Sequence, residues 1–180
     1  FLVEPHQGDI LYTMAKEDDF GTSLSNGLYA NTNLGEVFKE VSTTKSRDFI
    51  QLKDFAYYEP SEGAAAFVAS PIFDGTELIG VLILQLSIHQ IDAIMQEHSG
   101  LGETGETLLV SADDFLLRSN SRFVKGSTLF KLKLDNEATR AAATGDSGVK
   151  TILDSRHQAV LVAYKSLAIP VVQWLLLAQL

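Results

Sequence analysis

The chain has 180 residues, of which 46% are hydrophobic and none is cysteine. This is enough apolar sequence for one large core or two small ones, and the lack of cysteine excludes a disulfide framework and a zinc site with thiolate ligands. The net charge of −9 is concentrated in residues 1–99, which carry 15 acidic and 5 basic side chains, whereas residues 100–180 carry 8 and 9. Because the first half would repel phosphates and the second half has no basic stripe, we do not expect a nucleic-acid partner.

Several segments of the sequence occur twice in the same order. Residues 81–86 (VLILQL) reappear as residues 175–180 (LLLAQL), and residues 67–69 match residues 161–163 at the same offset. The apolar run, polar turn and second apolar run of the first twelve residues also recur from Thr107 onward. This pattern predicts two tandem copies of one small α+β module, the alternative being chance similarity between apolar strands.

Alternation, turn residues and helical spacing give the expected elements of the first copy. In chain order they are strands at 2–3 and 9–16, a helix at 34–41, and strands at 49–58, 64–73 and 77–86. Consecutive strands joined by short turns are antiparallel, so we expect one sheet with a helix lying across it.

A helix at 88–98 follows and leads into the second copy. Its expected elements are strands at 106–110 and 115–119, a helix at 136–143, and strands at 149–153, 158–166 and 172–180. By the repeat, a helix is also expected to precede Phe1 in a longer parent protein, from which this chain reads as a fragment. No apolar stretch has the length needed to span a bilayer.

The motifs that usually signal chemistry do not do so here. Residues 100–105 match the G-x-G-x-x-G pattern, but they follow a helix and lead into a strand, the reverse of a dinucleotide site, so we interpret them as a connector. The four histidines lack metal spacing, and the acidic run at 17–19 lacks the alternating ligands of a calcium loop and is expected to be a solvated loop. We therefore predict no catalytic residues, no metal and no cofactor.

The best candidate for a binding site lies on two neighbouring strands of the first copy. Alternation is expected to place Asp54 and Tyr58 on one face and Phe55 and Tyr57 on the other, with the small residues 64–66 leaving room beside the rings. Aromatic side chains with a few polar groups are typical of small-ligand pockets, although they also form ordinary cores. The predicted ligand-binding residues are Asp54, Tyr57, Tyr58, Phe67 and Ser70.

Four segments together resemble one known family. Residues 100–110 and 117–123 resemble the membrane-proximal module of bacterial double Cache sensor domains, also called double PDC domains, and residues 8–22 and 69–81 resemble their membrane-distal module. The resemblance implies two tandem PAS-like modules, each a five-stranded antiparallel sheet with flanking helices, at residues 1–94 (distal) and 100–180 (proximal). It also implies a periplasmic location between two transmembrane helices of an inner-membrane receptor, which forms a homodimer.

Parents of this family include chemotaxis receptors, sensor histidine kinases and cyclic-dinucleotide enzymes. Members that bind amino acids resemble one another in an Arg-x-Trp-Tyr signature that holds the ligand carboxylate, but the distal half of this chain has a single arginine, Arg47, and no tryptophan. We therefore expect a non-catalytic domain that senses a neutral or cationic small molecule. The alternatives are a receptor domain whose partner is a periplasmic protein, and an enzyme with an unrecognised site.

Overall fold

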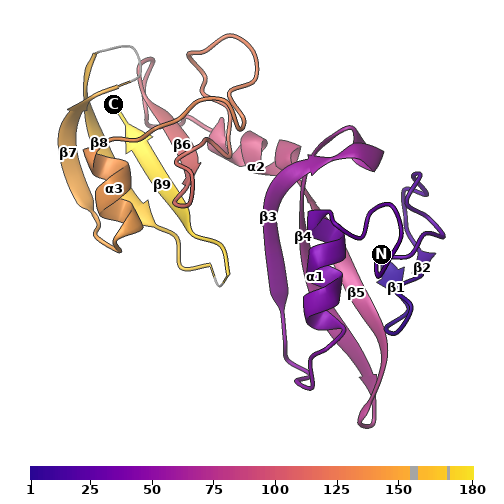
Figure 1. Cartoon of the computed structure of the whole chain (residues 1–180). Coiled ribbons are helices and arrows are strands. Elements are labelled where there is room, and N and C mark those ends of the chain that lie inside the picture. Colours follow the sequence, from indigo (N-terminus) through magenta and orange to yellow (C-terminus); the bar gives the residue numbers. More distant parts are fainter. Residues whose placement is uncertain (155–157, 170) are drawn as a thin grey trace. The chain divides into compact units, whose positions relative to one another are not determined.

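The structure is a computed structural model that describes residues 1–154, 158–169 and 171–180. It divides into two compact units, Phe1–Ile88 (unit 1) and His89–Leu180 (unit 2), each with its own sheet and core (Figure 1). Among the described residues, no helix combines the length and apolar character needed to cross a bilayer.

Unit 1 is a five-stranded antiparallel sheet with one helix on one face. The strands are β1 (Leu2–Val3), β2 (Ile10–Tyr12), β3 (Gln51–Tyr58), β4 (Gly63–Asp74) and β5 (Glu77–Ser87), and their order in the sheet is β2-β1-β5-β4-β3. A short 3-10 turn, η1 (Glu59–Ser61), joins β3 to β4. Helix α1 (Asn33–Val41) packs against β3 and β4 (Figure 1).

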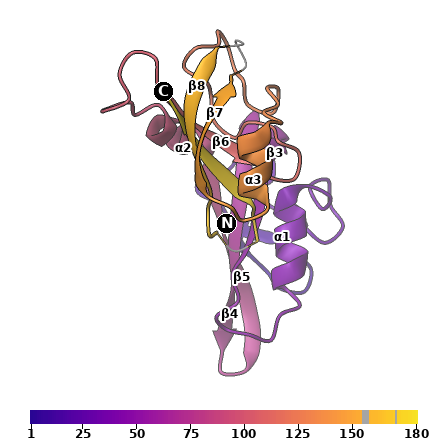
Figure 2. The same cartoon turned by 90° about the vertical axis from the view of Figure 1, so that its left-hand side faces the viewer.

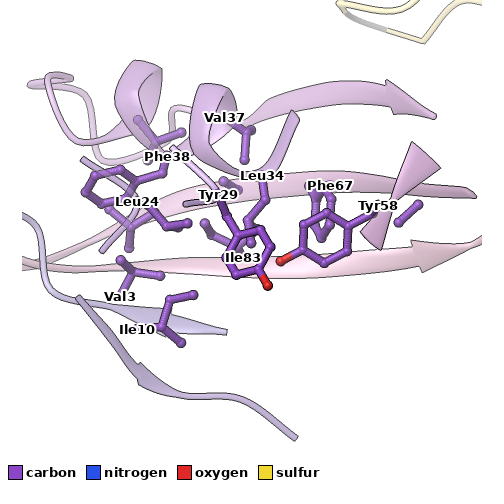
Figure 3. Packing of buried hydrophobic residues seen from close by; sticks show 14 residues of the cluster. Val3, Ile10, Leu24, Tyr29, Leu34, Val37, Phe38, Tyr58, Phe67 and Ile83 are labelled. Atoms are coloured by element: carbon purple, nitrogen blue, oxygen red, sulfur yellow. The ribbon is translucent and has the colours of Figure 1, made fainter. Parts of the chain in front are cut away.

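Helix α1 forms where the sequence supplies both a cap and an apolar stripe. The hydroxyl of Thr32 accepts a hydrogen bond from the amide of Gly35, which satisfies one of the free donors of the first turn. The apolar residues that follow recur at helical spacing and face the sheet. The resulting core, part of which is seen in Figure 3, comprises Val3, Ile10, Leu24, Tyr29, Leu34, Val37, Phe38, Val41, Tyr58, Ala65, Phe67, Ala69, Val81 and Ile83.

A β-bulge interrupts the pairing of β3 with β4. Lys53 pairs with Phe67 but Ala56 pairs with Ala65, so β3 contains one extra residue in this interval. The side-chain amide of Asn33 donates hydrogen bonds to the carbonyl oxygens of Asp54, at 3.1 Å, and Ala65, at 2.7 Å. The first residue of α1 therefore fixes the bulge and ties the helix to the sheet.

Unit 2 repeats this plan with fewer regular strands. Helix α2 (Ile88–Met95) leads into β6 (Glu106–Ser111), followed by α3 (Glu137–Ala143), β7 (Gly148–Leu153), β8 (Ala159–Ser166) and β9 (Trp174–Gln179). The antiparallel sheet has the order β6-β9-β8-β7, and α3 packs on it mainly against β8 (Figure 2). Matching β6 to β1 and β9, β8 and β7 to β5, β4 and β3 gives the same order in both units, which confirms the predicted repeat.

The expectation of five strands in each module is wrong for unit 2, whose sheet has four strands within the described ranges. The missing strand is the segment 115–119, which makes only isolated bridges, from Leu117 to β6 and from Leu116 to Lys133. Phe115 has a positive φ of 59°, and the carboxylate of Asp114 accepts a hydrogen bond from the amide of Leu116. This tight turn divides the backbone hydrogen bonds of the segment between two neighbours, so no regular ladder forms.

Replacement of Asn33 by Ala should destabilise unit 1, because the part-buried hydrogen bonds from its side-chain amide to the carbonyl oxygens of Asp54 and Ala65 are lost. The expected loss is about 1–3 kcal/mol in the free energy of unfolding, measured by amide hydrogen exchange in β4 and β5. The control is Asn31→Ala, which changes an exposed residue two positions away and should cost less than about 0.5 kcal/mol. Equal effects of the two substitutions would contradict the role of Asn33.

Replacement of Glu106 by Gln should destabilise unit 2. The buried Glu106 carboxylate accepts hydrogen bonds from the Ser121 hydroxyl at 2.7 Å, the Arg122 amide at 3.1 Å and the Gln179 side chain at 2.5 Å. In glutamine, the side-chain NH2 group would face one of these donors and could not accept its hydrogen bond, which should cost about 1–3 kcal/mol in the free energy of unfolding. Guanidinium unfolding followed by the fluorescence of the single tryptophan, Trp174 in β9, measures the change, and the exposed Glu103→Gln serves as the control.

Candidate ligand-binding site

Two of the five predicted site residues lie together in the core of unit 1. Tyr58, at the end of β3, and Phe67, in β4, are both fully buried, and their rings meet edge to face with centroids 5.0 Å apart. Tyr29, from the loop before α1, lies on the other side of Tyr58 at 6.0 Å, and the two hydroxyl groups point to the same region (Figure 3). The aromatic residues of this end therefore pack against one another.

The other three predicted residues lie elsewhere. Asp54 and Tyr57 line an open hollow of about 490 Å³ beside the start of α1, where the Tyr57 side chain is 70% exposed. Ser70 is adjacent in β4 to the core residue Ala69, so alternation turns it to the opposite face of the sheet. The bulge in β3 breaks the regular alternation that was expected to place Asp54 beside Tyr58.

The structure adds Asp19, a residue that the sequence analysis assigned to a solvated loop. That assignment is wrong for Asp19, which is 0% exposed, although its neighbour Asp18 is exposed. Oδ2 of Asp19 accepts a hydrogen bond of 2.5 Å from the Tyr58 hydroxyl. Oδ1 is also buried, and none of the described residues donates a hydrogen bond to it. No sequence signal identifies this pair, because its members lie 39 positions apart.

The surroundings of Asp19 disfavour its charge. Burial raises the pKa of Asp19 above its ordinary value and the nearby charge of Glu17 raises it further, while the hydrogen bond from Tyr58 and the backbone amide of Asp19 itself act in the opposite direction. The pKa of Tyr58 is raised as well, first by burial and then by Asp19.

The loop that carries Asp19 is tied to β5 through a short chain of hydrogen bonds. The carboxylate of Glu17 accepts a hydrogen bond of 2.8 Å from the Ser61 hydroxyl, which in turn accepts one of 2.9 Å from the side-chain amide of Gln85. Glu17 and Gln85 also line a surface groove of about 490 Å³ whose other walls are largely apolar. The remaining lining residues are Phe1, Leu2, Tyr12, Thr13, Met14, Ala15, Leu82, Ile83, Leu84 and Ser87.

Arg47 lies at the other end of the unit 1 sheet. Its guanidinium group is 5.8 Å from the ring centroid of Phe73, next to the turn between β4 and β5. Tyr58 pairs with Gly63, ten residues earlier in β4, which corresponds to roughly 30 Å along the strand. Arg47 therefore cannot contribute a positive charge to the end of unit 1 that contains Asp19.

Unit 2 has buried charged groups, but they have partners. Arg118 is paired with Asp114 at 3.1 Å and lies over the ring of Phe130, and Glu106 accepts the three hydrogen bonds described above. In the described ranges of the chain, no three His, Asp or Glu side chains come together as metal ligands. His157 lies outside the described residues. Among the described residues, the buried side-chain atoms without a hydrogen-bond partner are Oδ1 of Asp19 and Oδ1 of Asn33.

Comparison of sequences identifies no relative: neither a protein-family model nor a curated protein sequence matches the chain. Comparison of structures, in contrast, identifies several similar domains. The periplasmic sensory domain of the Campylobacter jejuni chemoreceptor Tlp1 matches with a TM-score of 0.62 and 18% identity, over 89% of this chain and 57% of that one. The ligand-binding domain of the Pseudomonas fluorescens chemoreceptor CtaA, in complex with L-isoleucine, matches with a TM-score of 0.54 and 12% identity, over 86% and 58%.

A third match covers nearly the whole chain. The ligand-binding domain of the Pseudomonas aeruginosa amino-acid chemoreceptor PctC, in complex with GABA, matches with a TM-score of 0.62 and 14% identity, over 99% of this chain and 72% of that one. This chain therefore spans less than two thirds of the length of the first two proteins and about seven tenths of the third. The chain has the two-module fold of the periplasmic ligand-binding domains of bacterial chemoreceptors, as its resemblance to double Cache domains implied.

Proposed function

We propose that this chain is the extracytoplasmic, ligand-sensing part of a bacterial transmembrane signalling receptor. The observation that carries the proposal is the shared fold: the chain aligns over 86–99% of its length with the sensory domains of three chemoreceptors, two of which hold a ligand. Residues 1–94 would form the membrane-distal module and residues 100–180 the membrane-proximal one. The domain binds its ligand without transforming it, and the parent receptor acts as a homodimer.

Unit 1 is the module in which we place the ligand. It contains a buried carboxylate with one unused oxygen, a largely apolar groove lined by Glu17 and Gln85, and a second hollow lined by the candidate residues Asp54 and Tyr57. The acidic composition of residues 1–99 favours neutral or cationic molecules over anions. The similar structures hold L-isoleucine and GABA, each of which carries one ammonium and one carboxylate group at neutral pH and so has no net charge.

A thermal-shift screen of the 180-residue chain against a metabolite library tests this function. A ligand at ten times its Kd adds about 1.4 kcal/mol to the stability of the unit that binds it, which should raise its Tm by roughly 5–10 °C. At least one neutral or cationic metabolite should give such a shift. The ligand should perturb the amide hydrogen exchange of unit 1 and leave that of unit 2 unchanged.

The other functions predict different results. If no metabolite stabilises the chain and a periplasmic protein does, the domain senses a protein partner. If a stabilising compound is converted to a product, the domain is an enzyme. A ligand seated in unit 2 would leave the sensing function in place but would contradict its assignment to unit 1.

A further inference from the structure

We infer that unit 1 has a second binding site, for an anion, at the end of its sheet away from Tyr58, and that its ligand is a small phosphate monoester. The site is an open hollow of about 520 Å³ lined by the segment after α1 and by the hairpin between β4 and β5, which lie at the same end of unit 1 (Figure 1). It shares no described lining residue with the groove or with the hollow that contains Asp54 and Tyr57, so the inference goes beyond the proposed sensing function.

Two basic side chains line this hollow without a counter-ion. In the described ranges of the chain, neither Lys45 nor Arg47 forms an ion pair with an acidic side chain. Other basic side chains of the unit are engaged: Lys39 donates to a backbone carbonyl, and Lys53 is paired with two glutamates of α1. An unpaired lysine beside an unpaired arginine can bind an anion without first breaking a contact within the fold.

The guanidinium group of Arg47 is held but has free donors. It lies 5.8 Å from the ring centroid of Phe73, a cation–π contact that restrains the side chain. Its N–H groups have no acceptor among the residues that the structure describes. Because a guanidinium presents its donors as a planar fork, it binds two oxygens of a phosphate group at once.

Hydroxyl groups at the end of α1 favour an anion in two ways. The last carbonyls of a helix carry partial negative charge, but here the hydroxyls of Ser42 and Thr43 donate to carbonyls of the last turn and reduce this effect. The hydroxyls of Thr44 and Thr76 also line the hollow, and neither donates a hydrogen bond within the described part of the chain. They are therefore available as further donors to an oxyanion.

The acidic excess of residues 1–99 does not extend into the hollow. Among the described residues, no acidic side chain lines it, although Asp48, Asp74 and Glu77 are neighbours of lining residues along the chain. The nearby carboxylate of Glu4 accepts a hydrogen bond from the amide of His6. Salt screens exposed charges over about 8 Å, so the groups that touch an anion outweigh these more distant carboxylates. Net charge alone predicts that this half repels phosphates, and the hollow is a local exception.

The set of donors favours a phosphate monoester over a carboxylate. A phosphate monoester carries a charge of about −1.5 to −2 near pH 7 and three terminal oxygens, which can use both cations and the hydroxyl groups. A carboxylate has one charge and two oxygens. The half-buried side chains of Phe73 and Leu78 add an apolar wall, against which a short carbon body can pack.

Titration of the unmodified chain with four small molecules tests the inference. Butyl phosphate is the proposed kind of ligand, pentanoate carries the same butyl group on a carboxylate, inorganic phosphate lacks the carbon body, and dibutyl phosphate has the single charge of a lipid phosphodiester. Because ligands of this size bind weakly, each is added to about 50 mM at constant ionic strength while the amide resonances of the isotopically labelled chain are followed. Butyl phosphate should shift the amides of residues 42–47 and 73–78, and should bind at least about threefold more tightly than each of the other three.

Each other outcome contradicts the inference in a different respect. If pentanoate binds as tightly, the hollow recognises a single charge and is not a phosphate site. If inorganic phosphate does, the apolar wall contributes nothing and the ligand needs no organic body; if dibutyl phosphate does, the site recognises a phosphodiester. If no amide of the two segments shifts, the hollow binds no anion. None of these results bears on the sensing function, which the library screen tests separately.

Three substitutions that each remove one positive charge localise the anion. Arg47→Gln should weaken binding of butyl phosphate at least about fivefold and Lys45→Gln at least about threefold, since each removes charge-assisted hydrogen bonds. Lys16→Gln removes the same charge from an exposed position that does not line the hollow, and should change the affinity less than about 1.5-fold. Equal losses in all three variants would show that net charge alone attracts the anion. Because Lys45 and Arg47 are exposed, the variants should melt at the temperature of the wild type, which circular dichroism checks.

Discussion

One buried hydrogen bond, from the hydroxyl of Tyr58 to the carboxylate of Asp19, joins the long loop between β2 and α1 to the sheet of unit 1. A carboxylate withdrawn from water is costly unless donors replace the water, so this bond sets which side of the loop can face the core. The same loop supplies Tyr29 to the core and Glu17 to the chain of hydrogen bonds that ends on β5. The position of the loop, the packing of the aromatic rings and the shape of the groove all depend on this contact.

The two units treat their buried polar groups differently, although they share one strand order. In unit 2, Glu106 is the first residue of β6 and has a donor for each carboxylate oxygen, so the free-energy cost of its burial is offset within the fold. In unit 1, Asp19 has a donor for one oxygen only. In a duplicated module, the buried carboxylate of one copy can thus have all its hydrogen bonds within the fold, while that of the other copy retains an oxygen without a donor. The difference lies in single side chains that the repeat itself does not specify.

The strands and helices were largely predictable because they follow local rules. Alternation marked β4 and β5, the helical spacing of the apolar residues from Leu34 onward marked α1, and the internal repeat gave the order of the strands, whereas the cap expected at Asn31 or Asn33 is Thr32. The bulge in β3 was not predictable, because the residue that fixes it, Asn33, lies on another element. The burial of Asp19 was hidden for the same reason: its partner is distant in sequence, and a run of acidic residues ordinarily faces solvent. Of the predicted site residues, Tyr58 is the one that donates a hydrogen bond to Asp19, and the sequence predicts it only as an aromatic group on a strand.

The side-chain hydrogen bonds of Gln85 give the end of β5 a mechanical role within unit 1. Gln85 donates to the hydroxyl of Ser61, which donates to the carboxylate of Glu17, so β5, η1 and the loop that carries Asp19 are joined by side chains alone. A displacement of this loop would therefore act on the end of β5 directly, without any rearrangement of the pairing between the strands.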